Sequence, residues 1–282
     1  MTGSIRSGFV TFVGRPNVGK STLLNRIIGT KVSIVSDKVQ TTRSPVRGVL
    51  HRPDAQVVFV DTPGIHNPRG PLGRRLHETA TGSISGVDVV CLVLDATAPL
   101  GGGDRFVAGQ VPDDAVVVLN KVDRASPAQV LRQLQAAGEL GMSEYFPVSA
   151  LTGDGVDQLV DRLVTRLPEG PAYYPSDAVT DVPEAIWVAE LVREQLLAVL
   201  RDELPHSLAT RVTEWEWPRI RCEILVTRDS QKGIVIGRGG SVLKTVGSAV
   251  RRQLTPGAYL ELMVKVDKDW QRRPQGLERL GY

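Results

Sequence analysis

One glycine-rich segment of eight residues constrains the fold of this chain more than any other feature. It lies between an apolar run typical of a buried strand, Phe9–Val13, and a run typical of a helix, Thr22–Ile28. The segment itself, Gly14–Ser21, has the pattern Gly-x-x-x-x-Gly-Lys-Ser. In this context glycines let successive backbone N–H groups turn inward toward phosphate oxygens, and the helix N-terminus adds partial positive charge. The segment therefore predicts an α/β domain that holds a phosphate chain.

The side chains of this segment divide the work of phosphate binding. Lys20 supplies a full positive charge near the outer phosphates, and the Ser21 hydroxyl is an oxygen ligand of the kind that Mg²⁺ prefers. We expect nucleotide contacts from the whole run and from the first residue of the helix that follows it: Gly14, Arg15, Pro16, Asn17, Val18, Gly19, Lys20, Ser21 and Thr22.

The first 167 residues alternate strand-like and helix-like runs, as a doubly wound α/β domain does. Several strand-like runs are almost continuously apolar, which is typical of parallel strands buried on both faces. A mostly parallel sheet with helices on both faces binds ligands at the carboxyl ends of its strands. Further strands are expected at Val57–Val60, Val87–Leu94, Ala115–Leu119 and Tyr145–Val148, and helices at Pro127–Ala137 and Val156–Leu167.

Asp61-Thr62-Pro63-Gly64 directly follows one of these strands. An aspartate at a strand end can reach Mg²⁺ through water, and the backbone N–H of Gly64 can reach a γ-phosphate. We therefore expect Asp61, Thr62, Pro63 and Gly64 to contact the nucleotide, with Asp61 acting on the metal.

Asn120-Lys121-Val122-Asp123 follows the next strand but one and has the spacing for recognising a base. The Asp123 carboxylate can accept hydrogen bonds from both N1–H and the 2-amino group of guanine, a donor pair that adenine lacks. Lys121 can lay its alkyl stem on the purine, and Asn120 can tie this loop to the phosphate loop. After the last strand, Ser149-Ala150-Leu151 can offer a backbone N–H to guanine O6, and we expect Ser149 and Ala150 to contact the nucleotide.

These four motifs, in this order and each at a strand end, resemble the P-loop GTPases of the translation-factor class. The sequence Gly-Arg-Pro-Asn-Val-Gly-Lys-Ser is similar to that of the Era and Der-type branch of ribosome-associated GTPases. The resemblance implies GTP and GDP as ligands and Mg²⁺ as a cofactor. It also identifies Lys38–Arg43 as similar to switch I, in which Thr42, or alternatively Thr41, would close over Mg²⁺ and the γ-phosphate.

The residue after Gly64 bears on the rate of hydrolysis. Ras-like GTPases orient the attacking water with a glutamine there, whereas this chain has Ile65. The resemblance therefore implies slow intrinsic turnover, with Lys20, Thr42 and Gly64 positioning the phosphate and the water. In some relatives an asparagine that matches Asn17 helps bind a potassium ion, so K⁺ is a candidate cofactor.

The remainder of the chain predicts a linker and a second domain. Prolines and glycines interrupt residues 169–183, so we expect domains at 1–168 and 184–282 joined by this linker. Residues 171–218 carry nine acidic and three basic side chains, whereas residues 219–273 carry twelve basic and five acidic. A basic segment that folds as a unit is either a solvated face or the footprint of a nucleic-acid surface.

A second glycine loop decides between these alternatives. The expected element order is helix, strand, strand, short helix, helix, strand, with Gly237-Arg238-Gly239-Gly240 between the last two helices. This order and the Gly-x-x-Gly loop resemble an α+β type II KH domain, which clamps about four nucleotides of single-stranded RNA. The ranges that carry this order are Glu184–Leu200, Ala209–Trp217, Arg219–Thr227, Ser241–Leu254 and Ala258–Val266.

The resemblance to KH domains selects a set of RNA-binding residues. The loop glycines allow close approach of the RNA backbone, an apolar groove lies beside the loop, and basic side chains face phosphates. The set is Lys232, Ile236, Gly237, Arg238, Gly239, Gly240 and Lys244. Tryptophans 215 and 217 could stack on bases, but we expect burial against the sheet for both, and packing for Trp270 as well.

Composition fits a cytoplasmic protein with two cores. Hydrophobic residues make up 41% of the 282, no apolar stretch approaches the roughly 18 residues of a membrane span, and no signal-peptide pattern is present. Cys91 and Cys222 lie in apolar runs far apart in the sequence, so we expect two buried reduced thiols rather than a disulfide or a metal pair.

The resemblance to Era-type GTPases covers nearly the whole chain and implies its partners. These are the 3′ region of the 16S ribosomal RNA and the 30S subunit, whose assembly the family assists. It also implies a monomer and peripheral association with the inner face of the cell membrane, although no residue pattern here supports the latter. The alternatives are an RNA-binding scaffold in which the nucleotide is mainly structural, and a tRNA-modification GTPase, which the KH-like loop does not suit.

Overall fold

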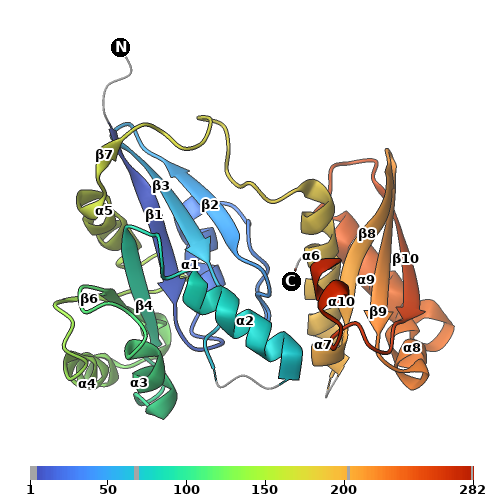
Figure 1. Ribbon diagram of the computed structural model, residues 1–282, viewed down its shortest axis with the longest axis horizontal. Coiled ribbons are helices and arrows are strands. Elements are labelled where there is room, and N and C mark those ends of the chain that lie inside the picture. The colour runs from blue at the N-terminus through green and yellow to red at the C-terminus, as the bar shows by residue number, and fades with distance from the viewer. Residues whose placement is uncertain (1–4, 67–69, 202–203, 281) are drawn as a thin grey trace. The chain divides into compact units, whose positions relative to one another are not determined.

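A computed structural model describes residues 5–66, 70–201, 204–280 and 282 (Figure 1). The contacts between residues divide the chain into two compact units, one built mainly from residues before Val182 and the other mainly from Val182–Tyr282. Each unit has its own sheet and its own buried core. The predicted start of the first domain, at residue 1, lies outside the described residues.

The sheet of the first unit has the strand order β2-β3-β1-β4-β5-β6, with the short strand β7 paired to β1. Pairing is parallel except between β2 and β3 and between β1 and β7. The expectation of a mostly parallel sheet is confirmed. The strands are β1 (Ile5–Val13), β2 (Val46–His51), β3 (Ala55–Asp61), β4 (Val89–Asp95), β5 (Val116–Asn120), β6 (Glu144–Pro147) and β7 (Glu169–Gly170).

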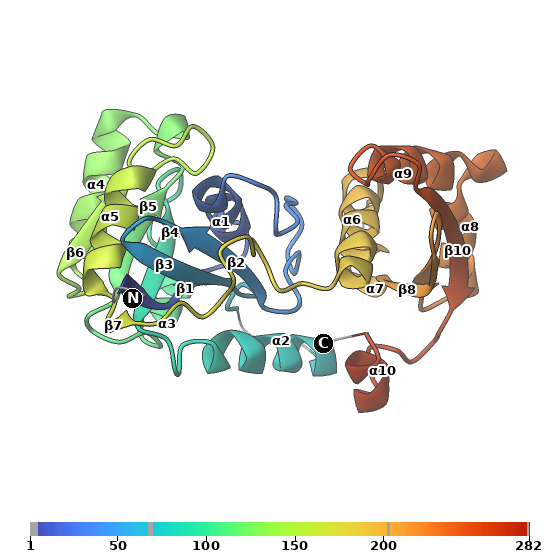
Figure 2. The ribbon, with the colours of Figure 1, turned by 90° about the horizontal axis from the view of Figure 1, so that it is seen from above.

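Helices cover both faces of this sheet. Alternate residues of the strands belong to two separate buried clusters, because successive side chains of a strand point to opposite faces. Helices α1 and α5 contribute to one cluster and α2, α3 and α4 to the other, and Figure 2 shows α1 and α2 on opposite sides of the sheet. The helices are α1 (Lys20–Ile28), α2 (Gly70–Gly82), α3 (Gly102–Ala108), α4 (Pro127–Gly138) and α5 (Val156–Arg166).

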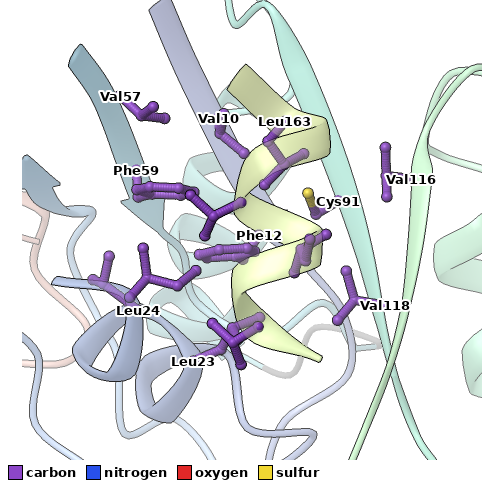
Figure 3. Packing of buried hydrophobic residues seen from close by; sticks show 14 of the residues in the cluster. Val10, Phe12, Leu23, Leu24, Val57, Phe59, Cys91, Val116, Val118 and Leu163 are labelled. Carbon is purple, nitrogen blue, oxygen red and sulfur yellow. The ribbon is translucent and has the colours of Figure 1, made fainter. Parts of the chain in front are cut away.

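The cluster beneath α1 and α5 anchors the elements that carry the phosphate loop (Figure 3). The rings of Phe12 and Phe59 stack with their centroids 5.4 Å apart, and both side chains are fully buried. Leu23 and Leu24 from α1 and Leu163 from α5 close over them. Each such side chain contributes about 1.5–3 kcal/mol by leaving water, so the start of α1 is held firmly against the sheet.

Short-range signals set the ends of several helices. Helix α4 begins after Ser126, whose Oγ accepts from the Gln129 N–H while Gln129 Oε1 accepts from the Ser126 N–H, at 3.3 and 2.8 Å. Helix α1 ends at Ile28, and Gly29 directly after it adopts a left-handed conformation with φ of 76°.

The stretch predicted as a linker, residues 169–183, has more regular structure than the sequence suggested. Strand β7 lies within it, and the side chain of Gln56 bonds both the N–H and the C=O of Tyr174. Farther along, Arg47 donates to Asp181 at 2.8 Å. Backbone groups that prolines leave unpaired locally are satisfied by the first unit, so this part of the stretch is bound to its surface.

The second unit has a three-stranded sheet in the order β10-β9-β8, with β9 parallel to β10 and antiparallel to β8. Its element order confirms the expected α+β KH pattern, and Figure 1 shows its parts. Between α8 and α9 lies a short 3-10 helix, Arg238–Gly240. The elements are α6 (Glu184–Val199), α7 (Leu204–Ser207), β8 (Ala209–Glu216), β9 (Arg219–Val226), α8 (Asp229–Ile236), α9 (Ser241–Arg251), β10 (Tyr259–Val266) and α10 (Pro274–Glu278).

The two faces of this sheet differ in chemistry. Cys222 and Ile224 of β9 are fully buried in one cluster with residues of α6, α8 and α9. The alternate residues of β9 form ion pairs with the neighbouring strands on the opposite face. These pairs are Arg211–Glu223, Lys265–Glu223, Arg219–Glu261, Arg221–Glu261 and Arg221–Glu214.

The tryptophans of the second unit divide between surface and core. Burial of Trp215 and Trp217 was the wrong expectation, since 37% and 55% of these side chains are exposed. Strand β8 is buried at its start and exposed over its last four residues, and Trp217 follows directly after it. Trp270 is 1% exposed and its Nε1–H donates to the carbonyl of Ser207 at 3.3 Å, so packing is confirmed there.

Both cysteines are free and fully buried, as expected. Burial raises the pKa of the Cys222 thiol to about 12 and raises that of Cys91 further, so both stay protonated at neutral pH. Among the residues that the structure describes, no helix combines the length and the apolar character needed to span a membrane.

Candidate functional site

The phosphate loop runs from the end of β1 into the first turn of α1. Gly19 has φ of 100°, and a Cβ placed on it would lie 2.3 Å from Nδ2 of Asn120. A Cβ on Gly14 would lie 2.5 Å from the carbonyl oxygen of Val93. Both positions therefore need glycine, because residues of the neighbouring strands β4 and β5 lie directly against the backbone.

Other side chains of the loop face away from its centre. Arg15 donates to the carboxylate of Asp104 at 2.8 Å, and Val18 is buried in the core. Thr22 is half-buried in the first turn of α1. Arg15 and Val18 thus contact protein around the loop, and Thr22 follows Ser21 in α1.

Lys20 lies across the loop and is 6% exposed. Its ammonium donates to the carbonyl oxygens of Gly14 and Arg15 at 3.1 and 3.0 Å. Burial lowers the pKa of Lys20 to about 8, while the nearby Asp61 carboxylate acts in the opposite direction. A buried ammonium gains from any further negative charge, so the loop is suited to an anion such as a phosphate group.

Three hydroxyl groups converge on a single oxygen of Asp61. Ser21, Ser33 and Thr42 donate to Asp61 Oδ2 at 2.5, 2.8 and 3.3 Å, and the Ser21 and Thr42 oxygens are 3.1 Å apart. Asp61 Oδ1 is buried and has no hydrogen-bond partner among the described residues. Burial raises the pKa of Asp61, and the Lys20 ammonium and the three hydroxyls oppose that rise.

This group of oxygens fits a magnesium ion. Mg²⁺ prefers hard oxygen ligands, is held by few protein groups and keeps several waters. Ser21 and Thr42 offer hydroxyl oxygens, and the unpartnered Oδ1 of Asp61 offers an acceptor for a metal-bound water. No group of three or more His, Cys, Asp or Glu residues that could hold another kind of metal occurs in the described part of the chain.

The loop after β3 folds back onto the phosphate loop. A Cβ on Gly64 would lie 2.6 Å from the backbone nitrogen of Pro16, and the N–H of Ile65 donates to the carbonyl of Gly14 at 3.1 Å. The backbone of Gly64 therefore lies against the backbone of the phosphate loop, where a side chain would not fit.

The neighbours of Gly64 are tied into the core. Thr62 is fully buried and donates through Oγ1 to the carbonyl of Phe12 at 2.9 Å, and Pro63 is also buried. Ile65 is 1% exposed and packs with buried residues of the sheet. The side chain that follows Gly64 thus points into protein, where it cannot orient a water molecule.

Asn120 links the base-recognition motif to the phosphate loop. Its Nδ2 donates to the carbonyl of Val18 and its Oδ1 accepts from the N–H of Ala150, both at 2.9 Å. The Ala150 N–H, one of the candidate donors to guanine O6, is thus engaged by Asn120. The hydroxyl of Ser149 donates to Asp123 Oδ1 at 2.6 Å, so the structure brings these motif residues together.

Lys121 crosses from the base motif to the phosphate loop. It has φ of 68°, and its ammonium donates to the carbonyl of Asn17 and to Asp95 Oδ2, each at 2.6 Å. Burial raises the pKa of Asp95, but hydrogen bonds from Lys121 and Thr97 outweigh it and lower the pKa overall. Asn17 is exposed and also has a positive φ, 66°.

The switch I segment distinguishes its two threonines. Thr42 is 8% exposed and its hydroxyl is turned to Ser21 and Asp61. The hydroxyl of Thr41 instead donates to the carbonyl of Lys38 at 2.6 Å. The geometry brings Thr42 to the oxygen cluster and leaves Thr41 outside it.

Sequence reasoning missed two residues of this region. Asp95 ends strand β4, and the rule that ligands bind at strand ends could have found it. Ser33 lies in a loop outside every recognised motif, so no signal in the sequence marked it.

The second glycine loop joins α8 to α9. Gly237, Gly239 and Gly240 have φ of 77°, 57° and 77°. A Cβ on Gly237 would lie 2.7 Å from the backbone nitrogen of Val242, whereas one on Gly239 or Gly240 would meet no atom within 4 Å. The tip of this loop is therefore open on its outer side.

Basic and apolar side chains surround the open tip. Lys232, Arg238 and Lys244 are exposed, and none of them forms an ion pair with a residue that the structure describes. Ile236 is half-buried, and Ile234, which sequence reasoning did not select, is 56% exposed on α8. Cationic groups beside an accessible backbone suit a phosphodiester chain.

Comparison with known proteins gives concordant results for both units. A family described as "50S ribosome-binding GTPase" matches residues 9–121, and the KH domain family matches residues 203–271. The chain is 47% identical over 296 aligned positions to the GTPase Era of Mycobacterium bovis (strain BCG / Pasteur 1173P2) and to that of Mycobacterium tuberculosis (strain ATCC 25177 / H37Ra), covering 98% of each chain.

Solved structures agree over the whole length. A variant of Aquifex aeolicus Era bound to GDP and AlF₄⁻ is 38% identical, covers 99% of both chains and gives a TM-score of 0.93. Era in complex with MgGDPNP and nucleotides 1506–1542 of 16S ribosomal RNA is 39% identical, with the same coverage and a TM-score of 0.94. With this likeness along its whole length, and with a nucleotide site built as described, the chain belongs to the Era family of GTPases and is an enzyme that hydrolyses GTP.

Proposed function

We propose that this GTPase is a nucleotide-dependent switch that binds the 3′ region of 16S ribosomal RNA and assists assembly of the 30S subunit. The observation that carries the proposal is the second glycine loop. Its tip is open at Gly239 and Gly240, and Lys232, Arg238 and Lys244 are exposed around it. The solved complex of an Era relative with 16S ribosomal RNA supports the same assignment here.

In the nucleotide site we assign roles by chemistry. The backbone of Gly14–Ser21 and the Lys20 ammonium bind the phosphates, and the backbone N–H of Gly64 reaches the γ-phosphate. Asp123 accepts from guanine N1–H and the 2-amino group, and Lys121 covers the purine. Asn120 holds the phosphate and base loops together through its bonds to Val18 and Ala150.

Magnesium completes the phosphate site in this proposal. Ser21 and Thr42 would hold it directly and Asp61 through water, as their converging oxygens allow. When bound, the ion neutralises charge on the outer phosphate oxygens. Thr42 comes from switch I, so its contact with the site distinguishes the GTP state from the GDP state.

Intrinsic hydrolysis is slow in this proposal because Ile65 is buried in the core and supplies no polar group to the attacking water. Unassisted GTPases turn over at about 10⁻⁴ to 10⁻² s⁻¹. We further propose that Asn17, exposed at the edge of the phosphate loop, contributes to a potassium site. Turnover is then faster in KCl than in NaCl at equal ionic strength, and equal rates in the two salts would contradict the potassium site.

The RNA assignment is tested by placing a negative charge at the open tip of the loop. Gly239→Asp adds a carboxylate where a Cβ meets no atom, so it repels phosphate without a steric clash, at the cost of some backbone strain at φ of 57°. We expect affinity for an oligonucleotide of the 16S 3′ end to fall about 10- to 100-fold by fluorescence anisotropy with GDPNP bound, an effect of about 1.4–2.8 kcal/mol. GTP hydrolysis without RNA should stay unchanged.

Gly138→Asp is the matched control, since it adds the same charge at another open glycine, at the end of α4 in the first unit. It should bind the RNA as the unaltered protein does. Equal RNA affinity of the Gly239→Asp variant and the unaltered protein would contradict the proposed RNA site. A monomeric state and peripheral association with the cell membrane remain expectations from the family resemblance.

A further inference from the structure

Ser33 is the one hydroxyl on Asp61 that the proposed function does not use. Ser21 and Thr42 are assigned to the metal, but Ser33 donates to Asp61 Oδ2 at 2.8 Å and is 1% exposed. A buried serine can simply satisfy its own hydroxyl, so its position and its surroundings must decide whether it does more.

The backbone that carries Ser33 is fixed to α1 by a single side chain. Asn25 Oδ1 accepts from the N–H groups of Val32 and Ser33, both at 2.9 Å, and Asn25 Nδ2 donates to the carbonyl of Ser33 at 2.8 Å. Val32 and Ile34 on either side are 4% and 2% exposed. Ser33 is therefore held to the helix that begins at the phosphate loop, and it does not belong to the switch I segment.

The three donors differ in what else they must do. Ser21 has to present a lone pair to the metal while its hydroxyl proton is donated to Asp61, and Thr42 comes from the switch I segment. Only Ser33 donates to Asp61 without a second assignment. Because it occupies Oδ2, the carboxylate cannot turn freely, and Oδ1 stays unpartnered.

We propose that Ser33 is a positioning residue for the magnesium site: it pins Oδ2 of Asp61 so that Oδ1 remains available to a metal-bound water, whichever nucleotide is present. This inference rests on the magnesium site proposed above. Asn25 supports Ser33 in turn, because it fixes the backbone from which the Ser33 hydroxyl reaches Asp61.

The test measures how Mg²⁺ slows the release of GDP. Release of a fluorescent GDP analogue is followed by stopped flow across a Mg²⁺ titration, which gives the concentration for half-maximal slowing, and again in EDTA. In Ser33→Ala we expect this midpoint to rise about tenfold, the effect of one lost hydrogen bond to a charged group. The release rate in EDTA should stay within about twofold of that of the unaltered protein.

Two further variants separate positioning from packing. Ser33→Thr keeps the hydroxyl and should keep the low midpoint. Ser36→Ala removes another serine hydroxyl nearby in sequence, whose hydrogen bonds within the described structure go to its neighbours Asp37 and Lys38, and it should not shift the midpoint.

An unshifted midpoint in Ser33→Ala, an equal shift in Ser36→Ala, or a Ser33→Thr variant as weak as Ser33→Ala would each overturn the inference. The inference would also be overturned if Ser33→Ala changed the rate of GDP release by the same factor in EDTA and in Mg²⁺, because such a change would be purely structural. The two proposals fail separately: if Mg²⁺ does not slow GDP release even in the unaltered protein, the magnesium site itself is wrong.

Discussion

The two glycine loops of this chain use glycine for opposite reasons. In the phosphate loop a Cβ on Gly14 or Gly19 would collide with protein atoms 2.5 and 2.3 Å away. In the loop between α8 and α9, a Cβ on Gly239 or Gly240 would meet nothing within 4 Å. The first loop is closed by the protein itself, whereas the tip of the second is open for something that approaches from outside.

This difference shows how each loop selects its ligand. Around the phosphate loop, side chains of Lys20, Asn120 and Lys121 bond its carbonyl groups and fix its shape in advance. A preformed loop suits a small, rigid phosphate chain. Around the second loop, the basic side chains are exposed and unpaired with described residues, which suits a long and flexible polyanion.

The comparison is tested most sharply by placing alanine at one glycine of each loop. The loss of GDP affinity in the phosphate-loop variant is the largest effect that we expect. In Gly19→Ala the new Cβ displaces the Asn120 amide from Val18 and strains a φ of 100°. We expect GDP affinity to fall about 100-fold, or about 2.7 kcal/mol, by titration with a fluorescent GDP analogue. In Gly239→Ala, GDP affinity should not change, because the new Cβ meets no atom.

Gly239→Ala should still lower the stability of the second unit slightly. Alanine in the left-handed region at φ of 57° should destabilise the second unit by about 1 kcal/mol, measured by urea unfolding. If Gly19→Ala bound GDP as tightly as the unaltered protein, the account of a closed first loop would be wrong.

The parts of the molecule that the sequence predicted well are those with local signals. Runs of apolar residues marked the parallel strands, and the two glycine loops marked the ends of elements where ligands bind. Strand β2 and helices α2 and α3 were not predicted. Helix α3 begins with Gly102 and Gly103, which are poor helix formers, and β2 contains Gly48.

Tertiary contacts explain why β2 forms. A Cβ on Gly48 would lie 2.8 Å from Ile28 and 2.9 Å from Leu24, so this glycine lets α1 pack closely on the strand. Such a contact joins residues far apart in the sequence and leaves no local pattern. The same limit hid Ser33, whose partner Asp61 lies at a distance along the chain.

Asp61 in the first unit and Glu223 in the second are both buried carboxylates, but their roles differ. Asp61 at the phosphate site receives hydroxyls and keeps one oxygen without a partner in the described structure. Glu223, 3% exposed on β9, is paired on the sheet with Arg211 and Lys265. The first is kept available for chemistry, whereas the second is fully used in holding three strands together.

Glu223→Gln tests this second role and has the smaller expected effect. Burial raises the pKa of Glu223, but the bonds from Lys265 and Arg211 outweigh it and lower the pKa below the usual 4.5. A carboxylate with a lowered pKa stabilises the fold above its unfolded-state pKa, and that stability is lost as pH falls through its folded-state value. The variant should therefore lose about 1–2 kcal/mol at pH 7, and the difference should shrink below about pH 4.

Tryptophan fluorescence during urea unfolding can measure this loss, because all four tryptophans lie in the second unit, at positions 187, 215, 217 and 270. The control is Glu261→Gln on the same face of the sheet, whose pairs with Arg219 and Arg221 are more exposed to solvent. It should have a much smaller effect. If the two variants lost the same free energy of unfolding, or if the loss in Glu223→Gln were unchanged in acid, the Glu223 carboxylate would not be what holds the strands together. The contrast with Asp61 would then no longer hold.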